Sequence, residues 1–390
     1  MKYRSRTFDS IDDVPIADWL RVSQNSPSRD FMLPAFIQTV EADSGSFKKF
    51  RHVIVYGAGE EPVACASFSL FPLDMTDVVS PSMARFIKGL PRPLSRLFRP
   101  LIVICGLPVS LGQSTVAFTA GCDVNEAVFL LDETASRLSD EASAQLILFK
   151  EFDVHDAQTL DVLRTRGYSR LETPAVNVFD TIFNSFDEYC EALKSRYRNK
   201  IRHSMRKLSA AGAQVQVLTD PGEILSRYTE EVHQLYLAVV AKAEFKLEVL
   251  TIEFFRELVR QFPARVELVV IEREGRIVAF NWTFRTQIAY HFLFAGVDYR
   301  LNRQLDLYFN IMFAAFAAGL RTGLGKIEVG QTADEFKARL GCTQRRLYAF
   351  ARGTRWDTAC LIRYGQRFFL PMRAAPSFNI FKPGARVPEQ

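Results

Sequence analysis

The chain carries one pattern of strands and helices twice, and this repeat limits the folds that it can adopt. Residues 53–64 and 268–279 each read as an apolar strand, a glycine-containing charged turn and a second strand that begins Val-Ala. Each hairpin is followed by a further apolar strand, a long apolar helix and a short strand. The helices are expected at about 124–138 and 304–320, and the short strands at 146–149 and 327–329. The shared order of five elements predicts two similar domains of α/β type.

The length and composition of the chain agree with two domains. A chain of 390 residues fits two domains of roughly 150–200 residues each, and its hydrophobic content of 48% is ample for two cores. The hairpins are offset by 215 residues and the short strands by roughly 180, so the first copy holds about 35 extra residues. We expect an N-terminal domain at 1–185, a C-terminal domain at 186–375 and a tail at 376–390.

Several classes of protein are disfavoured by the sequence. The longest apolar runs, 101–112 and 309–320, are shorter than the ~20 residues that span a bilayer. The first residues carry charges without an apolar segment behind them, which argues against a secretory signal. The six cysteines show no CxxC or other metal-binding spacing, which indicates reduced structural thiols and no metal site. We therefore expect a cytoplasmic protein without a transmembrane segment.

A basic segment lies in the extra residues of the first copy, an insertion at about 75–100. No acidic residue occurs between Asp77 and Asp123, and large apolar residues alternate with the cations of this segment. The cations are Arg85, Lys88, Arg92, Arg96 and Arg99. Segment 83–99 could rest peripherally on the anionic inner membrane surface or bind an acyl carrier protein. The alternative is a loop whose charges are solvated.

A second basic cluster falls in a helix expected at 195–208. Tyr197, Ile201, Met205 and Leu208 recur every three to four residues as its buried stripe. Arg198, Arg202 and Arg206 share another face, where like charges repel each other. Such a face suits an anionic ligand, above all phosphate, which guanidinium groups bind in a bidentate manner. The alternative is a solvated face paired with acids such as Asp187 or Glu230.

Two segments resemble a known family. One is the basic helix at 196–207 followed by the strand Gly-Ala-Gln-Val-Gln-Val at 212–217, and the other is Glu-Val-Gly-Gln-Thr-Ala-Asp-Glu-Phe-Lys-Ala-Arg-Leu-Gly-Cys at 328–342. Both are similar to the second domain of FemAB-like acyltransferases, which have two tandem GNAT domains. The resemblance covers about 190–352, and the first half rests on the repeat. It implies two tandem α+β domains, each a mixed, mostly antiparallel sheet with flanking helices, of which the first is degenerate and the second catalytic.

The resemblance also implies a chemistry, the transfer of an acyl or aminoacyl group to an amine. The co-substrate would be an acyl-CoA or acyl-carrier-protein thioester, with a small-molecule amine as acceptor and no permanently bound cofactor. A typical GNAT domain binds coenzyme A pyrophosphate with a glycine-rich loop, but here 300–305 reads Arg-Leu-Asn-Arg-Gln-Leu. Arg300, Arg303 and Gln304 could instead bind phosphate through their side chains. The alternatives are an aminoacyl-tRNA donor and a non-catalytic binding protein.

Amine attack on a carbonyl requires a base and stabilisation of the oxyanion. Glu328 is a lone carboxylate in an apolar strand, and it serves either as the base or as the partner of Lys326 or Lys337. Tyr290 and His291 are adjacent on a strand, so only one of them can face the cleft. The remaining candidates are Lys337 with the donor, beside Asp334 in a short helix, and Asn281, Trp282 and Gln331 in the acceptor pocket.

Overall fold

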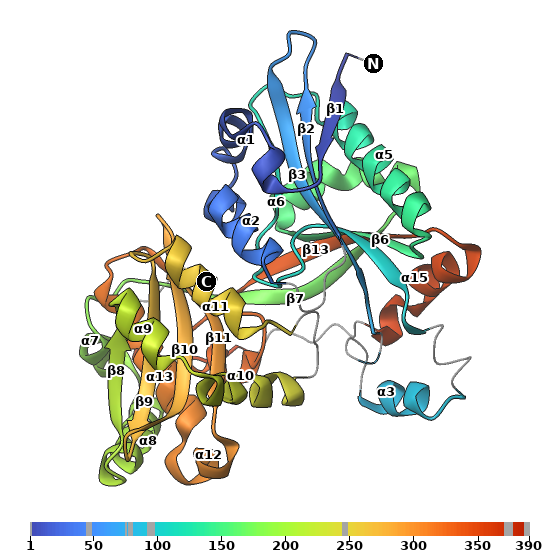
Figure 1. Ribbon diagram of the computed structural model, residues 1–390. Helices are drawn as coiled ribbons and strands as arrows, with labels where there is room; N and C mark the ends of the chain where they lie inside the picture. Colours follow the sequence, from blue (N-terminus) through green and yellow to red (C-terminus); the bar gives the residue numbers. More distant parts are fainter. Residues whose placement is uncertain are drawn as a thin grey trace. The chain divides into compact units, whose positions relative to one another are not determined.

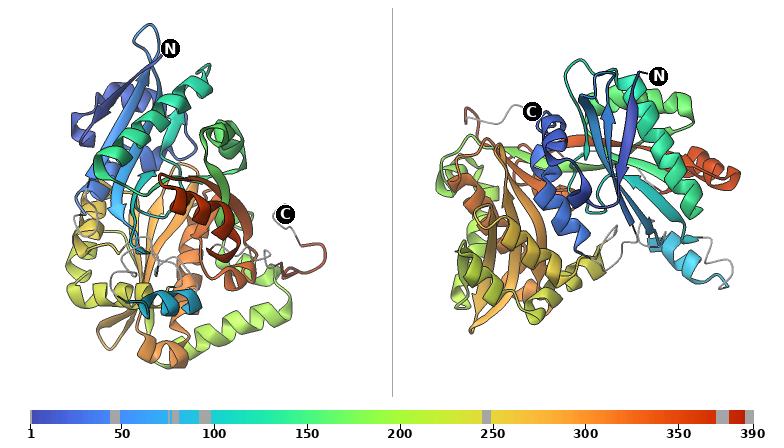
Figure 2. Two further views of the ribbon diagram at one scale, coloured as in Figure 1. Left: turned by 90° about the vertical axis from the view of Figure 1, so that its right-hand side faces the viewer. Right: turned by 45° about the horizontal axis from the view of Figure 1, so that its top comes forward.

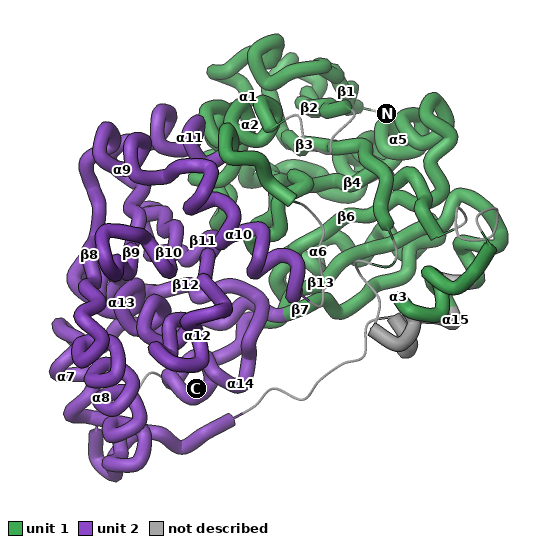
Figure 3. Tube along the Cα trace, turned by 60° about the horizontal axis from the view of Figure 1, so that its bottom comes forward, with its two compact units in different colours: residues 1–174, 244–254, 346–373 green, residues 175–243, 255–345, 374–390 purple. Residues whose placement is uncertain are grey.

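The computed structural model describes residues 2–43, 49–74, 76, 81–91, 98–243, 249–369 and 377–385. The chain forms two compact units, which Figure 3 shows in different colours. Unit 1 comprises residues 1–174, 244–254 and 346–373, and unit 2 comprises residues 175–243, 255–345 and 374–390. In each unit, helices flank a mixed and mostly antiparallel sheet, which confirms the predicted fold class.

The sheet of unit 1 contains the first hairpin. Its strands, in spatial order, are β1 (Arg4–Phe8), β2 (Lys49–Tyr56), β3 (Pro62–Pro72), β4 (Leu101–Cys105), β6 (Leu146–Phe152) and β13 (Thr343–Gly353). A short strand, β5 (Val116–Phe118), also pairs with β3. The pair β4/β6 is parallel, whereas the pairs β1/β2, β2/β3, β3/β4 and β6/β13 are antiparallel.

Helices cover both faces of this sheet, as the views in Figures 1 and 2 show. On one face lies α5 (Val124–Ala142), which Asp123 caps by accepting hydrogen bonds from the first-turn N–H groups. Its apolar side packs on Val53 and Val55 of β2 in the main core of the unit. The other face carries α1 (Ile16–Ser23) and α2 (Pro34–Glu41), and the ring of Trp19 contacts His52 edge to face.

The sheet of unit 2 contains the second hairpin. Its strands, in spatial order, are β7 (Ser169–Asp180), β12 (Lys326–Gly330), β11 (Ala289–Val297), β10 (Arg276–Arg285), β9 (Val266–Arg273) and β8 (Gln214–Leu218). The core of the unit forms between this sheet, α8 (Ser195–Ala210) and α13 (Leu307–Arg321). Within the predicted tail, Ile380 is buried in this core and Phe381 forms a bridge with Leu193.

The remaining elements connect the sheets or cover their faces. In the first half they are η1 (Ile11–Asp13), η2 (Arg29–Met32), α3 (Pro81–Lys88), α6 (Val154–Thr159) and η5 (Leu160–Arg166). In the second half they are α7 (Phe186–Ala192), α9 (Pro221–Arg227), α10 (Glu230–Lys242), α11 (Ile252–Gln261), α12 (Tyr299–Leu305), α14 (Asp334–Ala338) and α15 (Trp356–Phe369).

The two halves share one topology, which confirms the repeat. In each half an antiparallel hairpin is followed by a third strand antiparallel to the second, a helix, and a strand parallel to the third. The matching elements are β2, β3, β4, α5 and β6 in the first half, and β9, β10, β11, α13 and β12 in the second. Both helices were predicted, at boundaries within a few residues of those observed.

The closing strands of the two halves are exchanged. Residues 348–353 of β13 come from the second half but pair with β6 in unit 1. Residues 177–180 of β7 come from the first half but pair with β12 in unit 2. The compact units are therefore discontinuous in sequence, and their boundaries fall within β7 and β13. The contiguous bounds at 1–185 and 186–375 stay a prediction about independently folding domains.

A buried carboxylate fixes β13 in unit 1. Asp132 of α5 is fully buried and accepts a hydrogen bond from the Tyr168 hydroxyl at 2.6 Å. It also forms ion pairs with Arg166 and, at 3.2 Å, with Arg352 of β13. A buried charge needs such partners, because an unpaired one is strongly destabilising. The network therefore contributes to the stability of unit 1 and not to a ligand site.

Replacing Tyr168 with Phe should lower the free energy of unfolding by about 1.5–3 kcal/mol, because a buried carboxylate loses a hydrogen bond. Urea unfolding followed by circular dichroism would measure the change. Tyr56→Phe is the matched control, since its hydroxyl donates to the half-buried Asp18 at 2.8 Å in the same unit. We expect the control to have the smaller effect, and equal effects would contradict the importance of the Asp132 network.

Candidate functional site

The parallel strands β11 and β12 separate soon after they begin to pair. Their ladder has three register pairs and ends at His291 and Glu328. Beyond this point β11 continues to Val297 and β12 to Gly330 without further pairing to each other. We call this opening the strand fork of unit 2. Backbone N–H and C=O groups on the facing edges of the two strands are thus released from the ladder, where they can bind a ligand.

Lys337 of α14 lies in the strand fork. A Cβ atom placed on Gly330 would be 3.7 Å from the Lys337 Nζ and 3.9 Å from the carbonyl oxygen of Phe292. The side chain of Lys337 is buried, with only 2% of the residue exposed. Burial lowers the pKa of Lys337 to about 8, although Cys342 and Asp334 act in the opposite direction. Within the described residues no carboxylate forms an ion pair with Nζ, so this buried ammonium is available to an anionic or partly negative ligand.

Glu328 is held by Arg345 and His291 at the last paired position of the fork. Its two carboxylate oxygens each accept a hydrogen bond from Arg345 at 3.1 Å, and Oε2 lies 3.5 Å from His291 Nδ1. Burial raises the pKa of Glu328, but the hydrogen bond and charge of His291 and the charge of Arg345 outweigh it and leave the pKa lowered. Glu328 is therefore ionised at neutral pH. The expected partners Lys326 and Lys337 are replaced by Arg345 and His291.

His291 is fixed from its other nitrogen by Thr286. The Thr286 oxygen lies 3.2 Å from His291 Nε2 and also contacts both the N–H and the carbonyl group of Ala289. A hydroxyl has a single proton. Donation of that proton to the Ala289 carbonyl leaves Nε2–H of His291 to donate to Thr286, so that Nδ1 faces Glu328. The imidazole is thus oriented toward the carboxylate rather than packed in an apolar core.

Tyr290 lies on the opposite face of the sheet from His291. It is fully buried in the core of unit 2, where its hydroxyl donates to Glu267 at 2.8 Å. Burial raises its pKa well above the ordinary range, and the Glu267 charge adds to this effect. The two neighbours face opposite ways, as strand alternation predicts, and His291 is the one beside Glu328. The structure does not bring Tyr290 together with Glu328.

The residues assigned to an acceptor pocket are separated as well. Asn281 is buried toward α13, with Nδ2 3.8 Å from the sulfur of Met312. Trp282 is fully buried on the other face, among the rings of Tyr228 and Phe255. Gln331 is half-buried next to Gly330 of the fork. A shared acceptor pocket made from Asn281 and Trp282 therefore stays a prediction without support from their geometry.

Phosphate binding by α8 and α12 has a competing explanation in ion pairs. Arg198 and Arg202 of α8 both pair with Glu191, at 3.3 and 2.6 Å. Arg300 binds the Asp298 carboxylate through Nε and NH2 at 3.0 and 2.7 Å, and Asp298 also caps α12. These hydrogen bonds keep the pKa of Asp298 below its usual range. Arg303 and Gln304 are exposed on α12.

The side chain of Asn302 caps the N-terminus of α13. Asn302 accepts a hydrogen bond from the Tyr308 N–H at 2.8 Å, and Asp306, in the left-handed conformation with φ of 50°, precedes the helix. The Asp306 carboxylate pairs with Lys207 at 2.9 Å. A helix N-terminus attracts phosphate through its free N–H groups and its dipole. Here the Asn302 amide oxygen accepts from one of these N–H groups, and the N-cap residue Asp306 is itself an acid, which disfavours pyrophosphate binding in the usual GNAT manner.

The equivalent opening in unit 1 is filled by the chain itself. Strands β4 and β6 also pair in parallel, from Ile102 and Leu146 to Cys105 and Phe149, and then separate. Lys150 follows at this point, but its Nζ donates to the Val109 carbonyl at 3.1 Å and pairs with Glu151 at 3.2 Å. Both side chains are 6% exposed. This internal pairing distinguishes unit 1 from unit 2 and favours unit 2 as the location of the site.

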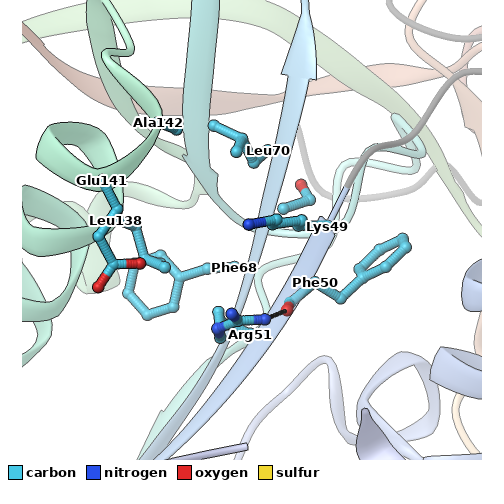
Figure 4. A pocket seen from close by; sticks show the side chains of 9 residues that line it. Lys49, Phe50, Arg51, Phe68, Leu70, Leu138, Glu141 and Ala142 are labelled. Atoms are coloured by element: carbon cyan, nitrogen blue, oxygen red, sulfur yellow. Dashed lines mark hydrogen bonds between the residues drawn. The ribbon is translucent and has the colours of Figure 1, made fainter. Parts of the chain in front are cut away.

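A surface depression lies elsewhere in unit 1, between β2, β3 and α5 (Figure 4). It has a volume of about 280 Å³, which includes open solvent, and Phe68, Leu70 and Leu138 form part of its lining. Arg51 at its edge donates to the Phe50 carbonyl and pairs with Asp9 at 2.8 Å. Its lining is largely apolar and its charged groups do not converge, so the depression lacks the features of a catalytic site.

The basic segment 83–99 is described only at its two ends. Arg92 and Arg96 lie outside the described residues, whereas Phe86 of α3 is 62% exposed and Arg99 pairs with Asp74 at 2.9 Å. Within the described part of the chain, no helix is both long and apolar enough to cross a bilayer. Binding of segment 83–99 to a membrane or a carrier protein stays a prediction.

Two residues of the site were missed from the sequence, Arg345 and Asn177. Arg345 follows the recognised motif and lies in β13, and Asn177 lies in β7, which comes from the first half. Asn177 Nδ2 donates to the Gly330 carbonyl at 3.0 Å and to Asp334 at 2.9 Å. A lone Asn in an apolar strand is a signal of burial with specific hydrogen bonds. Its partner, however, is more than 150 residues away in sequence.

Part of the chain is similar to a known family of domains. Residues 195–338, which include α8, the fork and Lys337, match the family model described as an acetyltransferase (GNAT) domain. No curated protein matches the sequence. The match to the GNAT domain and the fold of the chain support acyl or aminoacyl transfer in general.

Solved structures show the same fold over nearly the whole chain. FemX is similar over 92% of this chain and 99% of its own, with a TM-score of 0.55 and 12% identity. A tandem GNAT protein from the clavulanic acid biosynthesis pathway is similar over 90% of this chain and 98% of its own, with a TM-score of 0.51 and 11% identity. Residues 195–338 are thus similar to a GNAT domain, and the chain has the fold of these two proteins, as the FemAB-like resemblance implied.

Proposed function

We propose that this protein is an N-acyltransferase that moves an acyl group from an activated ester or thioester to an amine at the strand fork of unit 2. The observation that carries the proposal is Lys337, a buried ammonium that forms no ion pair with a carboxylate of the described residues and lies in a segment similar to a GNAT domain. A cation held away from water stabilises negative charge that develops in a transition state far better than an exposed one.

The residues of the fork divide the chemistry between them. The amine nitrogen attacks the donor carbonyl carbon, and the negative charge on the carbonyl oxygen is stabilised by Lys337. The ionised Glu328, fixed by Arg345 and His291, accepts the proton of the attacking amine. The carbon–sulfur or carbon–oxygen bond then breaks, and the leaving thiolate or alkoxide takes up the proton that Glu328 accepted, which regenerates the carboxylate. The products are an amide and the free thiol or hydroxyl of the donor.

The surroundings of α12 and α13 bear on the donor. The acid Asp306 and the capping Asn302 disfavour a coenzyme A pyrophosphate at the N-terminus of α13, so we place the donor elsewhere. The solvent face of α8 exposes Lys200, His203 and Arg206 and carries no acidic residue. This basic face suits an anionic macromolecule that presents the donor, and we propose an acyl carrier protein. A tRNA ester is the second candidate, since the same face suits a phosphate backbone.

A donor panel tests this function. The protein would be incubated with mixed amines and, in separate reactions, an acyl-CoA, the same acyl group on a carrier protein, and an aminoacyl-tRNA. Mass spectrometry would detect the amide. We expect product with a macromolecular donor and at least tenfold less with acyl-CoA. Faster reaction with acyl-CoA would overturn the proposed donor, and no product with any donor would favour a non-catalytic binding protein.

A further inference from the structure

The Oδ1 atom of Asn177 is a buried acceptor that receives no hydrogen bond from the described residues. The residue is 1% exposed, and its Nδ2 donates to two acceptors, the Gly330 carbonyl and the Asp334 carboxylate. Both partners accept only, so the amide orientation is fixed and Oδ1 must be the remaining atom. Oδ1 is buried and has no hydrogen-bond partner among the described residues. A buried, unsatisfied acceptor costs about 1–3 kcal/mol and calls for an explanation.

The place of Asn177 in the fold suggests that explanation. Asn177 is the register partner of Gly330, and Lys337 Nζ lies beside Gly330. Asp334, which accepts a hydrogen bond from Asn177, is the first residue of the helix that carries Lys337. Gly330 has a φ of 81° and Ala333 a φ of 58°, so the turn between β12 and α14 is held in a conformation that non-glycine residues rarely adopt. Asn177 thus fixes both ends of this turn.

We propose that Asn177 is a binding residue for the amine acceptor, with Oδ1 accepting a hydrogen bond from an amine N–H at the fork. This inference rests on the proposed function, because it assigns the amine to the same opening as Lys337. A buried acceptor without a partner favours a ligand that donates a hydrogen bond. Of the two reactants, the amine is the one with N–H groups on its reacting atom. Such a bond orients the nitrogen lone pair toward the donor carbonyl, which is the geometry that attack requires.

Strand β7, which comes from the first half, would then contribute an acceptor-binding residue to the site in unit 2. Asn177 lies in the closing strand of the first half and outside the GNAT domain match at 195–338. The exchanged strand therefore supplies an acceptor-binding group that the second half lacks on its own. Discrimination of this kind is strong, because a site built to accept an N–H rejects a ligand that cannot donate one.

The test compares Asn177→Leu with a matched control, Asn310→Leu. Asn310 of α13 is also buried, donates to two carbonyls, those of Ser204 and Leu305, and has an orphan Oδ1. Its contacts are to α8 and the α12 end, not to β12. The two variants should therefore lose similar stability, which thermal unfolding would check, while differing at the fork.

Kinetics with the donor and amine identified in the panel provide the readout. Asn177→Leu should raise the KM for the amine about tenfold or more and leave the KM for the donor within twofold, whereas Asn310→Leu should change neither. Equal changes in both KM values, or the same changes in Asn310→Leu, would overturn the inference. Calorimetric titration of the amine alone separates this failure from failure of the proposed function, because binding is measured without turnover.

Discussion

Replacing Lys337 with Met should abolish most of the turnover while making the protein more stable at neutral pH. Removal of one charge-stabilising group typically lowers kcat by about 10²–10³. The same ammonium is buried without a carboxylate partner among the described residues, and its pKa is about 8 rather than 10.5. By linkage the difference corresponds to roughly 3 kcal/mol, from about 2.5 pKa units at 1.36 kcal/mol each. A methionine of similar length avoids this cost of burying a charge.

The lowered pKa of Lys337 determines the direction in which the stability of the protein changes with pH. Between about pH 8 and 10.5 the unfolded chain binds a proton at Lys337 that the folded chain does not. The stability of the unmodified protein should therefore rise through this window, and Lys337→Met should lose that rise. Turnover should change in the opposite sense and fall above about pH 8, because Lys337 acts in its charged form. Thermal unfolding and single-turnover rates across this range measure the two trends.

Lys150→Met is the matched control for Lys337→Met. Lys150 occupies the equivalent opening of unit 1, but it is paired with Glu151 there. Its loss leaves a buried carboxylate unpaired and should destabilise the protein by about 3–5 kcal/mol. Below the melting temperature its kcat should stay close to that of the unmodified protein. A Lys337→Met protein that keeps its turnover, or that loses stability as Lys150→Met does, would contradict the assigned role.

Replacing Glu328 with Gln should lower kcat by about 10²–10⁴ while leaving donor affinity unchanged, because a general base acts in the transition state. The exchange keeps the shape and removes the charge that Arg345 and His291 hold. The lowered pKa of Glu328 also determines how the stability of the unmodified protein depends on pH. Glu328 has a lowered pKa, so its stabilisation is present above the ordinary value of 4.5 and is lost as the pH falls through the folded value.

Arg345→Met separates a catalytic from a structural role of Glu328. This variant breaks the same ion pair but keeps the carboxylate, so its loss of stability should be at least as large. If Glu328 is the base, Glu328→Gln should lower kcat far more than Arg345→Met does at the same folded fraction. If Glu328 only holds the strands together, the two variants should lose activity in proportion to their loss of stability.

Local patterns in the sequence predicted most of the fold. The alternation of residues and the apolar runs predicted the positions of both hairpins, both long helices and the parallel strands β6 and β12. The exchange of β7 and β13 was not predictable in this way. Each is an ordinary closing strand in sequence, and the choice of its pairing partner depends on contacts about 150 or more residues away.

The site was predicted in part. Strand alternation showed that Tyr290 and His291 face opposite ways, but not which of them meets Glu328, because that depends on the register with β12. Asn177 was missed because its partner Gly330 is more than 150 residues away in sequence, and Arg345 because it lies beyond the recognised motif at 328–342. The segment after β11 was expected to be a loop and instead forms α12, for which the capping residue Asp298 was an available signal. Arg198 and Arg202 pair with Glu191, where Asp187 and Glu230 were expected.

The central claim is that the donor and the amine meet in the strand fork of unit 2, and amide hydrogen exchange tests it most directly. Exchange would be compared with and without the active donor, bound to Glu328→Gln so that it is not consumed. The account predicts protection in 292–297 and 329–337, where β11 and β12 separate, and no change in 106–110 and 150–153 of unit 1. Protection confined to the unit 1 segments, or no protection in unit 2 at saturating donor, would contradict it.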